Sequence, residues 1–339
     1  SLRIQKRGVR NGRLRYQCQS CRYWFSLNRK AAAIDPTLLL IQHLDGTSFR
    51  SLANQYSISV GSAYTLVINE LKKLPHCADV TRKCCNRFCG ILLVDGKYIA
   101  VKGYERKIPV LYGIDYLTHD IPTYIFSIAE NYQTCLSYFQ SLKLLLYPLQ
   151  TVVCDDNQNI YQAADHIYPD CGIQLCLNHY KETIRANLAV RTDQTYVPFM
   201  REIEYLFEKR RSGTEFLQIA KKIARTHGSD ARCLSVLVDI QRRLPVLTGY
   251  MKQRRVPRTT NLIESFNSHL QGRLKTIKGF ESFDHADLWL NGFFLRRRTK
   301  EFTDCEGIFK KLNGTTSLSQ TQKLDLDATL FFNKKRARF

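Results

Sequence analysis

The spacing of apolar residues divides the chain into four zones. Residues 1–30 are basic and lack apolar periodicity, whereas residues 35–75 have the pattern of short helices. Across residues 90–175 the apolar runs are short, which indicates strands, and across residues 181–300 the spacing is mostly helical again. The pattern predicts a mixed α/β protein in which a strand-rich middle lies between helical segments.

The strand-rich zone opens with three predicted antiparallel strands. Ile91–Val101 is apolar on both faces, as a central strand is. Two further strands, Val110–Ile114 and Tyr124–Ile128, follow at short spacing, and residues 118–120 (Thr-His-Asp) form the connection between them. Such short connections favour antiparallel neighbours.

A helix and a fourth strand continue this zone. The apolar face of the helix is formed by Cys135, Phe139, Leu142 and Leu146. The fourth strand, Thr151–Cys154, ends at Asp155. Three strands, a helix and a further strand follow the order of an RNase H-like core, and we expect that fold.

Charge adds a class of partner to this picture. The chain has 51 Lys and Arg residues against 30 Asp and Glu, which gives a formal net charge of +21. Clustered positive charge binds polyanions by displacing their counterions, so we expect nucleic acid as the partner. A ribosomal-type protein, a membrane-surface protein and simple solubility are the alternatives that the charge leaves open.

The twelve cysteines indicate a reducing compartment rather than a disulfide framework. They are scattered through a large chain of ordinary composition, and no secretory signal opens the sequence. No run of about 18 apolar residues occurs, so no membrane span is expected. We expect some of the thiols to be buried and a few to be available to metal.

Two cysteines in the first zone form a CxxC motif. Cys18 and Cys21 lie in the basic and aromatic stretch Arg15–Phe25, which resembles the second half of a zinc ribbon. A closed structural Zn²⁺ site needs four ligands, and no CxxC lies between Ser1 and Cys18. We therefore predict a partial zinc ribbon over residues 1–30, with its other ligands expected before Ser1 in a longer chain. Two free cysteines on a hairpin are the alternative.

Residues 31–80 are predicted to form a helix-turn-helix unit for DNA binding. Ser48 can cap the first helix, and residues 57–59 (Ser-Ile-Ser) make the turn. The inward positions of the second helix are Ala63, Val67 and Leu71. The residues that this helix would present to a major groove are Ser62, Tyr64, Thr65 and Asn69. An ordinary helical hairpin without a ligand is the alternative.

Three carboxylates lie where metal-dependent phosphoryl transfer would need them. Asp95 interrupts an apolar strand, where a carboxylate is costly unless it is paired or bound to a metal. Asp155 closes the fourth strand, with Asp156 as its rival, and Glu264 lies in the first turn of a predicted helix. Carboxylates are the natural ligands of a Mg²⁺ or Mn²⁺ pair that clamps the attacking and leaving oxygens. A turn at Asp95 and a favourable helix dipole at Glu264 are the structural alternatives.

Taken together, these residues resemble the DDE transposases of the Mutator superfamily, over roughly residues 88–300. The matching segments are Val94-Asp95-Gly96, Val152-Val153-Cys154-Asp155, Cys176-Leu177-Asn178-His179, Thr259–Asn267, Arg273-Leu274-Lys275 and Gly279-Phe280. The Thr-Thr-Asn-x-Ile-Glu-x-x-Asn block is specific, whereas the short aspartate motifs persuade only by their order and spacing. The N-terminal CxxC matches a zinc-binding variant of the same group.

The resemblance implies an RNase H-like catalytic core at residues 88–300, split by an all-helical insertion at about 181–255. It gives Asp95, Asp155 and Glu264 the catalytic and metal-binding roles, with Mg²⁺ or Mn²⁺ as the cofactor. Cys176 and His179 match the C/DxxH element of the family, which could bind a metal or orient DNA. A buried cysteine and a satisfied histidine are the alternative for that pair.

Basic residues near the Glu264 helix are expected to contact phosphates, and residues 301–339 are predicted to form a basic tail. The expected phosphate contacts are Lys252, Arg254, Arg255, Arg258, Arg273, Lys275, Arg296, Arg297 and Arg298.

The implied function is transposition: metal-dependent cleavage at transposon ends, then joining to target DNA. The expected partners are the terminal repeats and the target, bound by a homodimer or a larger assembly in a bacterial or archaeal cytoplasm, at the nucleoid. Two alternatives stay open. A catalytically inactive, transposase-derived DNA-binding regulator would keep the fold, and a metal-dependent RNase or repair nuclease would explain the carboxylates but not the insertion.

Overall fold

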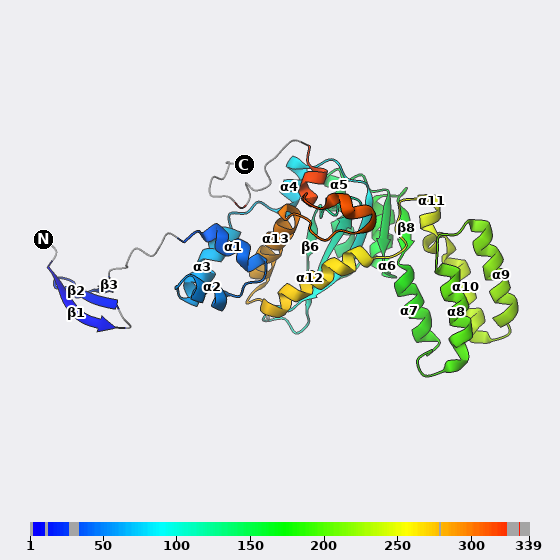
Figure 1. Cartoon of the computed structure of the whole chain (residues 1–339), viewed down its shortest axis with the longest axis horizontal. Coiled ribbons are helices and arrows are strands. Elements are labelled where there is room, and N and C mark those ends of the chain that lie inside the picture. Colours follow the sequence, from blue (N-terminus) through cyan, green and yellow to red (C-terminus); the bar gives the residue numbers. More distant parts are fainter. Residues whose placement is uncertain (1–2, 11–12, 27–33, 278, 324–331, 333–339) are drawn as a thin grey trace.

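The computed structural model of the chain describes residues 3–10, 13–26, 34–277, 279–323 and 332 (Figure 1). It is a mixed α/β protein whose centre is a five-stranded sheet with the strand order β6-β5-β4-β7-β8. Among the described residues, no helix is both long enough and apolar enough to cross a membrane.

The strand β4 (Ile91–Ile99) occupies the middle of this sheet, as its apolar pattern predicts. It pairs antiparallel with β5 (Ile108–Asp115), which pairs antiparallel with β6 (Tyr124–Phe126). On its other side β4 pairs parallel with β7 (Thr151–Cys154), and β7 pairs parallel with β8 (Gly172–Leu175). The predicted order of three antiparallel strands, a helix and a further strand is confirmed, and β8 extends the sheet by one more parallel strand.

Helices cover both faces of the sheet. On one face, α5 (Tyr132–Leu144) places the Tyr138 hydroxyl against Gly113. On the opposite face, the neighbouring Tyr112 packs its ring on α12 (Asn261–Ile277) and α13 (Phe283–Thr299). A third helix, α6 (Gln158–Ile167), packs against α5 and β7.

The prediction that Leu146 belongs to the apolar face of α5 is wrong. Leu146 is 88% exposed, because α5 ends at Leu144 and the chain then turns with a positive φ of 57° at Leu146. Tyr138 is buried on this face together with the predicted Cys135, Phe139 and Leu142.

A set of helices separates β8 from α12 and extends beyond the edge of the sheet (Figure 1). Its helices are α7 (Leu177–Asn187), α8 (Val197–Phe207), α9 (Gly213–His227), α10 (Ala231–Leu247) and the short α11 (Gly249–Lys252), with a 3-10 turn η1 (Gln194–Tyr196) before α8. The helical segment expected at about 181–255 is therefore present between β8 and α12. Its helices α10 and α11 contact β8, which ties the segment to the edge strand.

The chain begins with a small antiparallel sheet and a helical unit. The sheet consists of β1 (Ile4–Arg10), β2 (Arg13–Cys18) and β3 (Trp24–Ser26). The helical unit consists of α1 (Pro36–Leu44), α2 (Phe49–Gln55) and α3 (Val60–Leu71).

Local sequence explains the helical unit. Ser48 caps α2, and Ser59 caps α3 by accepting from the backbone N–H of Ser62. The turn between them passes through Ser57 at a φ of 53°. The predicted inward residues Ala63, Val67 and Leu71 are buried, and the unit packs on α13, where Gly292 lies against Leu71 and Leu44. The unit is therefore anchored to α13 through α1 and α3.

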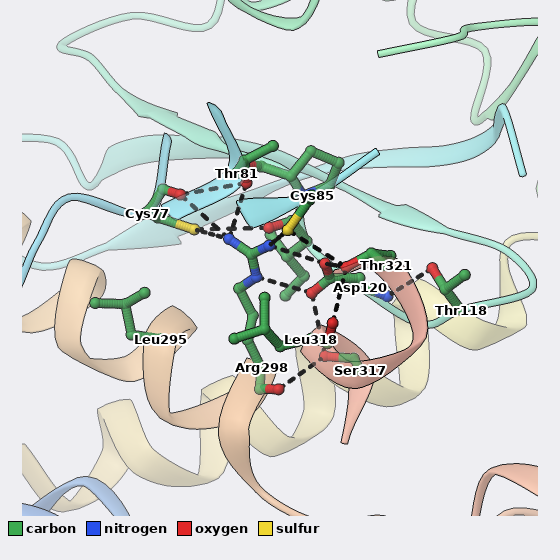
Figure 2. Close-up of polar contacts among 12 residues, drawn as sticks. Cys77, Thr81, Cys85, Thr118, Asp120, Leu295, Arg298, Ser317, Leu318 and Thr321 are labelled. Atoms are coloured by element: carbon green, nitrogen blue, oxygen red, sulfur yellow. Dashed lines mark hydrogen bonds and ion pairs between the residues drawn. The ribbon is translucent and has the colours of Figure 1, made fainter. Parts of the chain in front are cut away.

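A buried ion pair joins the C-terminal part of the chain to the sheet (Figure 2). Arg298 of α13 is fully buried, and its Nε and Nη2 each donate to one carboxylate oxygen of Asp120 at 2.8 Å. Ser317 and Thr321 of α14 (Ser317–Thr321) donate their hydroxyls to the same carboxylate at 3.2 and 2.6 Å. Because every charge in this cluster has a hydrogen-bonded partner, the cost of burying it is offset.

The same guanidinium also reaches α4 (Cys77–Cys84). Its Nη1 donates to the carbonyl oxygen of Cys77 at 3.1 Å and to the hydroxyl of Thr81 at 2.9 Å, and Nη2 lies 3.2 Å from the sulfur of Cys85 (Figure 2). Arg298 therefore connects α4, the β5–β6 connection, α13 and α14.

The predicted basic tail is wrong for residues 301–323. They include the 3-10 helix η2 (Gly307–Leu312) and α14, and an isolated bridge pairs Gln322 with Cys85. The basic residues Lys334, Lys335, Arg336 and Arg338 lie outside the described residues.

Replacing Arg298 by Met should destabilise the fold strongly, because the substitution leaves the Asp120 carboxylate buried without its counterion. We expect the free energy of unfolding to fall by roughly 3–5 kcal/mol. Chemical denaturation measures this change. The control is Arg296→Met, whose partner Asp45 is only half-buried, so that loss should stay below about 1 kcal/mol. Equal losses of unfolding free energy in the two variants would contradict a buried Arg298–Asp120 ion pair that stabilises the fold.

Candidate active site

Two predicted carboxylates lie next to each other because two parallel strands place them there. Leu93 of β4 pairs with Val153 of β7, and Asp95 and Asp155 each follow two residues later. Side chains two residues apart share a face of a sheet, so both carboxylates are on the face that α12 covers. Parallel pairing thus brings together two residues that are far apart in the sequence.

Asp95 is held by α12. Its Oδ2 accepts from Nδ2 of Asn267 at 2.6 Å, and its Oδ1 accepts from the backbone N–H of Gly96 at 2.8 Å. The hydroxyl of Tyr112 donates to Oδ1 of Asn267 at 2.5 Å, which leaves the amide group of Asn267 pointed at Asp95. Burial, followed by the nearby charge of Asp155, raises the pKa of Asp95 to about 6.

Asp155 and Asp156, the two candidates for the same metal-binding role, have different environments. Asp156 is exposed and forms an ion pair with Arg243, with Nη1 and Oδ2 2.5 Å apart. Asp155 is half-buried, and its Oδ1 is buried with no hydrogen-bond partner among the described residues. Burial raises the pKa of Asp155 also, while the charge of His179 opposes that rise. Asp155 is therefore the member of the pair with an oxygen left to bind a ligand.

Glu264 lies in the first turn of α12 and is grouped with the CxxH residues. Its Oε1 accepts from the hydroxyl of Thr260 at 2.5 Å and lies 4.0 Å from Nε2 of His179. The same Thr260 hydroxyl lies 3.1 Å from the sulfur of Cys176, and the ligand atoms of Cys176, His179 and Glu264 are all within 4.8 Å of one another. The α7 start and the α12 start therefore meet at one place.

Electrostatics links this group to the two aspartates. Hydrogen bonding to Cys176, then the charges of Glu264 and Asp155, raise the pKa of His179 to about 9 against the effect of burial. Burial alone would raise the pKa of the Cys176 thiol. Hydrogen bonds with His179 and Thr260 outweigh this effect, so the pKa is lowered. The charge of His179 in turn acts on both Asp95 and Asp155.

A fourth carboxylate, Glu130, lies beside the site and was missed by the sequence reasoning. Its Oε2 accepts from the hydroxyl of Tyr98 at 2.8 Å, and its Oε1 accepts from Nδ2 of Asn157 at 2.6 Å. Gly96 leaves the space for it, since a Cβ there would come within 2.6 Å of Oε2. Glu130 thus connects β4 to the loop that follows Asp155. No motif marks it in the sequence, because its place before α5 is fixed only by the packing.

The residues present fit metal ions of two kinds. An unpaired buried carboxylate oxygen is costly, and a hard divalent cation between Asp95 and Asp155 would offset that cost. The sulfur, nitrogen and oxygen donors of Cys176, His179 and Glu264 are instead of the kind that Zn²⁺ accepts. That triplet is the only group of three or more close Cys, His, Asp or Glu ligands in the described part of the chain.

The N-terminal cysteines have fewer potential partners. Cys18 is buried at the end of β2, and Cys21 is exposed in the turn before β3. No third ligand joins them among the described residues, so a closed Zn²⁺ site is not formed by this part of the chain. The zinc ribbon stays a prediction.

The predicted DNA-facing residues of α3 are all accessible. Ser62, Tyr64, Thr65 and Asn69 are exposed, and the ring of Tyr64 packs edge-on against Phe49. These residues stay candidates for contact with a groove.

Some of the predicted phosphate contacts have exposed side chains, and others already contact protein groups. Exposed side chains are found at Lys252, Arg254, Arg255 and Lys275. Arg258 donates to the carbonyl oxygen of Phe207, Arg273 packs against Gly46, Arg296 pairs with Asp45, and Arg297 lies over the ring of Phe302.

Arg298 is a wrong prediction, because the burial and the ion pair with Asp120 leave no atom of its guanidinium accessible to a phosphate. Its place at the end of a basic run suggested a surface role, but α13 turns this position into the core.

No protein-family model and no curated protein matches this chain.

Replacing Asp95 by Asn should stabilise the metal-free protein at neutral pH. The pKa of Asp95 in the folded state is about 6, above the ordinary value of 3.8, so the folded state binds this proton more tightly. The stability linked to that proton is present below pH 4 and lost as the pH rises through 6. Because the side chain is partly exposed, we expect a gain of about 1–2 kcal/mol above pH 6 and none below pH 4.

Denaturant unfolding in EDTA across this pH range measures the effect. Asp156→Asn is the matched control, and it should destabilise the protein slightly because it breaks the ion pair with Arg243. A loss of stability in Asp95→Asn at neutral pH would contradict the raised pKa of Asp95 in the folded state.

Proposed function

We propose that this chain is a metal-dependent DNA transposase with an RNase H-like catalytic core. The observation that carries the proposal is the pairing of Asp95 with Asp155, two half-buried carboxylates of which one has an unpartnered buried oxygen. A second support is the strand order of the five-stranded sheet. Its first three strands along the chain, β4, β5 and β6, lie side by side, and the parallel strands β7 and β8 follow on the other side of β4. A third is the helical segment between β8 and α12, at the position that the resemblance to Mutator transposases implies.

Asp95 and Asp155 are the residues that would hold Mg²⁺ or Mn²⁺, and Glu264 would complete the site from α12. When bound, such ions act as Lewis acids toward a phosphodiester and lower the pKa of an attacking water. Carboxylates are suited to this task because both ions prefer oxygen ligands.

The chain's own residues supply the positioning. Asn267 and Gly96 fix the two oxygens of Asp95, and the ordered Tyr112–Asn267 pair keeps that amide from rotating. Thr260 fixes Glu264. In the proposed reaction, water gives a proton to solvent and its oxygen bonds to phosphorus at the transposon end, while the bond between that phosphorus and the 3′ oxygen breaks and the 3′ oxygen takes a proton from solvent. The freed 3′-hydroxyl then gives its proton to solvent and bonds to a phosphorus of the target, and the target's own 3′ oxygen leaves and takes up a proton.

The N-terminal part of the chain would supply DNA binding. Ser62, Thr65 and Asn69 are exposed on α3, whereas the exposed Tyr64 also packs its ring edge-on against His285 of α13. The net charge of +21 favours a polyanion as the partner. Because α3 and α13 are in contact, DNA held by α3 would have a defined place relative to the carboxylates.

Asp95→Asn and Glu264→Gln should each abolish Mn²⁺-dependent cleavage of duplex DNA that carries the terminal repeats of the host element. DNA affinity should change little, because these carboxylates do not attract phosphates. Gel analysis of labelled duplex measures cleavage, and fluorescence anisotropy measures binding. Asp156→Asn is the control and should retain cleavage, since its carboxylate is paired with Arg243. Cleavage that survives in Asp95→Asn would refute the proposal, and binding without cleavage by the parent protein would favour an inactive regulator.

A further inference from the structure

A polar groove opens beside Glu264 on the exposed side of α12. It has a volume of about 430 Å³ and lies between the polar face of that helix and Lys97 of β4. Helical spacing places Glu264, Asn267, Gln271 and Lys275 along one wall. Lys97 follows Asp95 by two residues, so its side chain emerges on the same face of the sheet as that carboxylate.

The composition of the groove differs from that of an ordinary small-molecule site. None of the described residues that line it has an apolar side chain. Small-molecule pockets are mostly apolar, with a few polar groups that orient the ligand. The groove also has no aromatic ring on which a base could stack, so its chemistry suits a sugar-phosphate backbone rather than bases.

Charge is arranged along the groove in a way that fits such a backbone. Among the residues that line the groove, Glu264 is the carboxylate and lies at the start of α12, Lys275 lies about three turns further along the same helix, and Lys97 comes from β4. Neither Lys97 nor Lys275 forms a hydrogen bond or ion pair with another described residue, so both ammonium groups are available to phosphates. The helix rises ~1.5 Å per residue, so Glu264 and Lys275 lie ~16 Å apart along its axis. That length matches roughly five nucleotides of one strand at about 3.4 Å each.

We propose that this groove holds the nucleic-acid strand that carries the reacting phosphate, and that Lys97 and Lys275 bind its backbone. The inference rests on the proposed function for the identity of the reaction, but the binding itself does not require cleavage. Lys97 becomes a substrate-positioning residue, which places a phosphate next to the Asp95–Asp155 pair. Gln271, between the lysine and the glutamate, is placed to donate to the same backbone.

Cross-linking tests the position of the strand directly. Gly272 borders the groove, and a Cβ added there would meet no atom within 4 Å, so Gly272→Cys should fold normally. Gly213 of α9 has the same free space and lies outside the groove, which makes Gly213→Cys a matched control. The probe is a labelled duplex with a short single-stranded 3′ extension that carries a thiol tether at its last phosphate. EDTA prevents any cleavage during the experiment.

We expect disulfide cross-links at Cys introduced in place of Gly272, above the yield of the parent protein and of Gly213→Cys. Lys97→Gln should lower that yield and reduce the slope of log affinity against log salt concentration by about one, as the loss of one phosphate contact does. Equal yields at the two positions, or an unchanged salt slope in Lys97→Gln, would overturn the proposal.

The outcome separates this inference from the proposed function. Cross-linking in the groove by a protein that never cleaves in Mn²⁺ would support the strand site and contradict the transposase assignment. Cleavage without cross-linking would leave the transposase assignment in place and refute the groove as the strand site.

Discussion

The parallel pairing of β4 with β7 is the constraint on which the site depends. It aligns Asp95 with Asp155 and withdraws both carboxylates from water. Burial raises the pKa values of both carboxyl groups, and the charge of Asp155 adds to the rise at Asp95. The apolar strands and helices around them offset this cost. An arrangement that costs stability and has an unpaired oxygen is typical of a place where a ligand binds.

The helix α12 connects the two aspartates to the rest of the molecule. Its first turn contributes Glu264, its next turn contributes Asn267 to Asp95, and its exposed face forms one wall of the groove with Lys97. The start of α12 meets the start of α7 through Thr260 and Cys176, so the helical segment between β8 and α12 returns the chain to the sheet at a defined point. The buried Arg298 then holds α13 and α14 against the same core.

Features that depend on residues close together in the sequence could be predicted from the sequence. Features that depend on packing between distant residues could not. Strand periodicity located β4, β5 and β7, and the serine caps located α2 and α3, because these signals depend on neighbouring residues. The exposure of Leu146 depended on where α5 ended, and the burial of Arg298 depended on Asp120, which is remote in the sequence. The Asp95–Asp155 pair was predicted from motif and order, whereas Glu130, Lys97 and the difference between Asp155 and Asp156 required the three-dimensional neighbours of each side chain.

The proposed site for a divalent metal ion at Asp95 and Asp155 can be tested by iron-directed cleavage of the protein. Fe²⁺ that replaces Mn²⁺ generates hydroxyl radicals with ascorbate and peroxide, which cut the backbone near the bound ion. If Asp95 and Asp155 hold the ion, we expect fragments that end close to residues 95 and 155. These fragments should be suppressed by excess Mn²⁺, absent in Asp155→Asn and retained in Asp156→Asn. Cuts only near Cys18 and Cys21, or cuts that persist in Asp155→Asn, would contradict the proposed site.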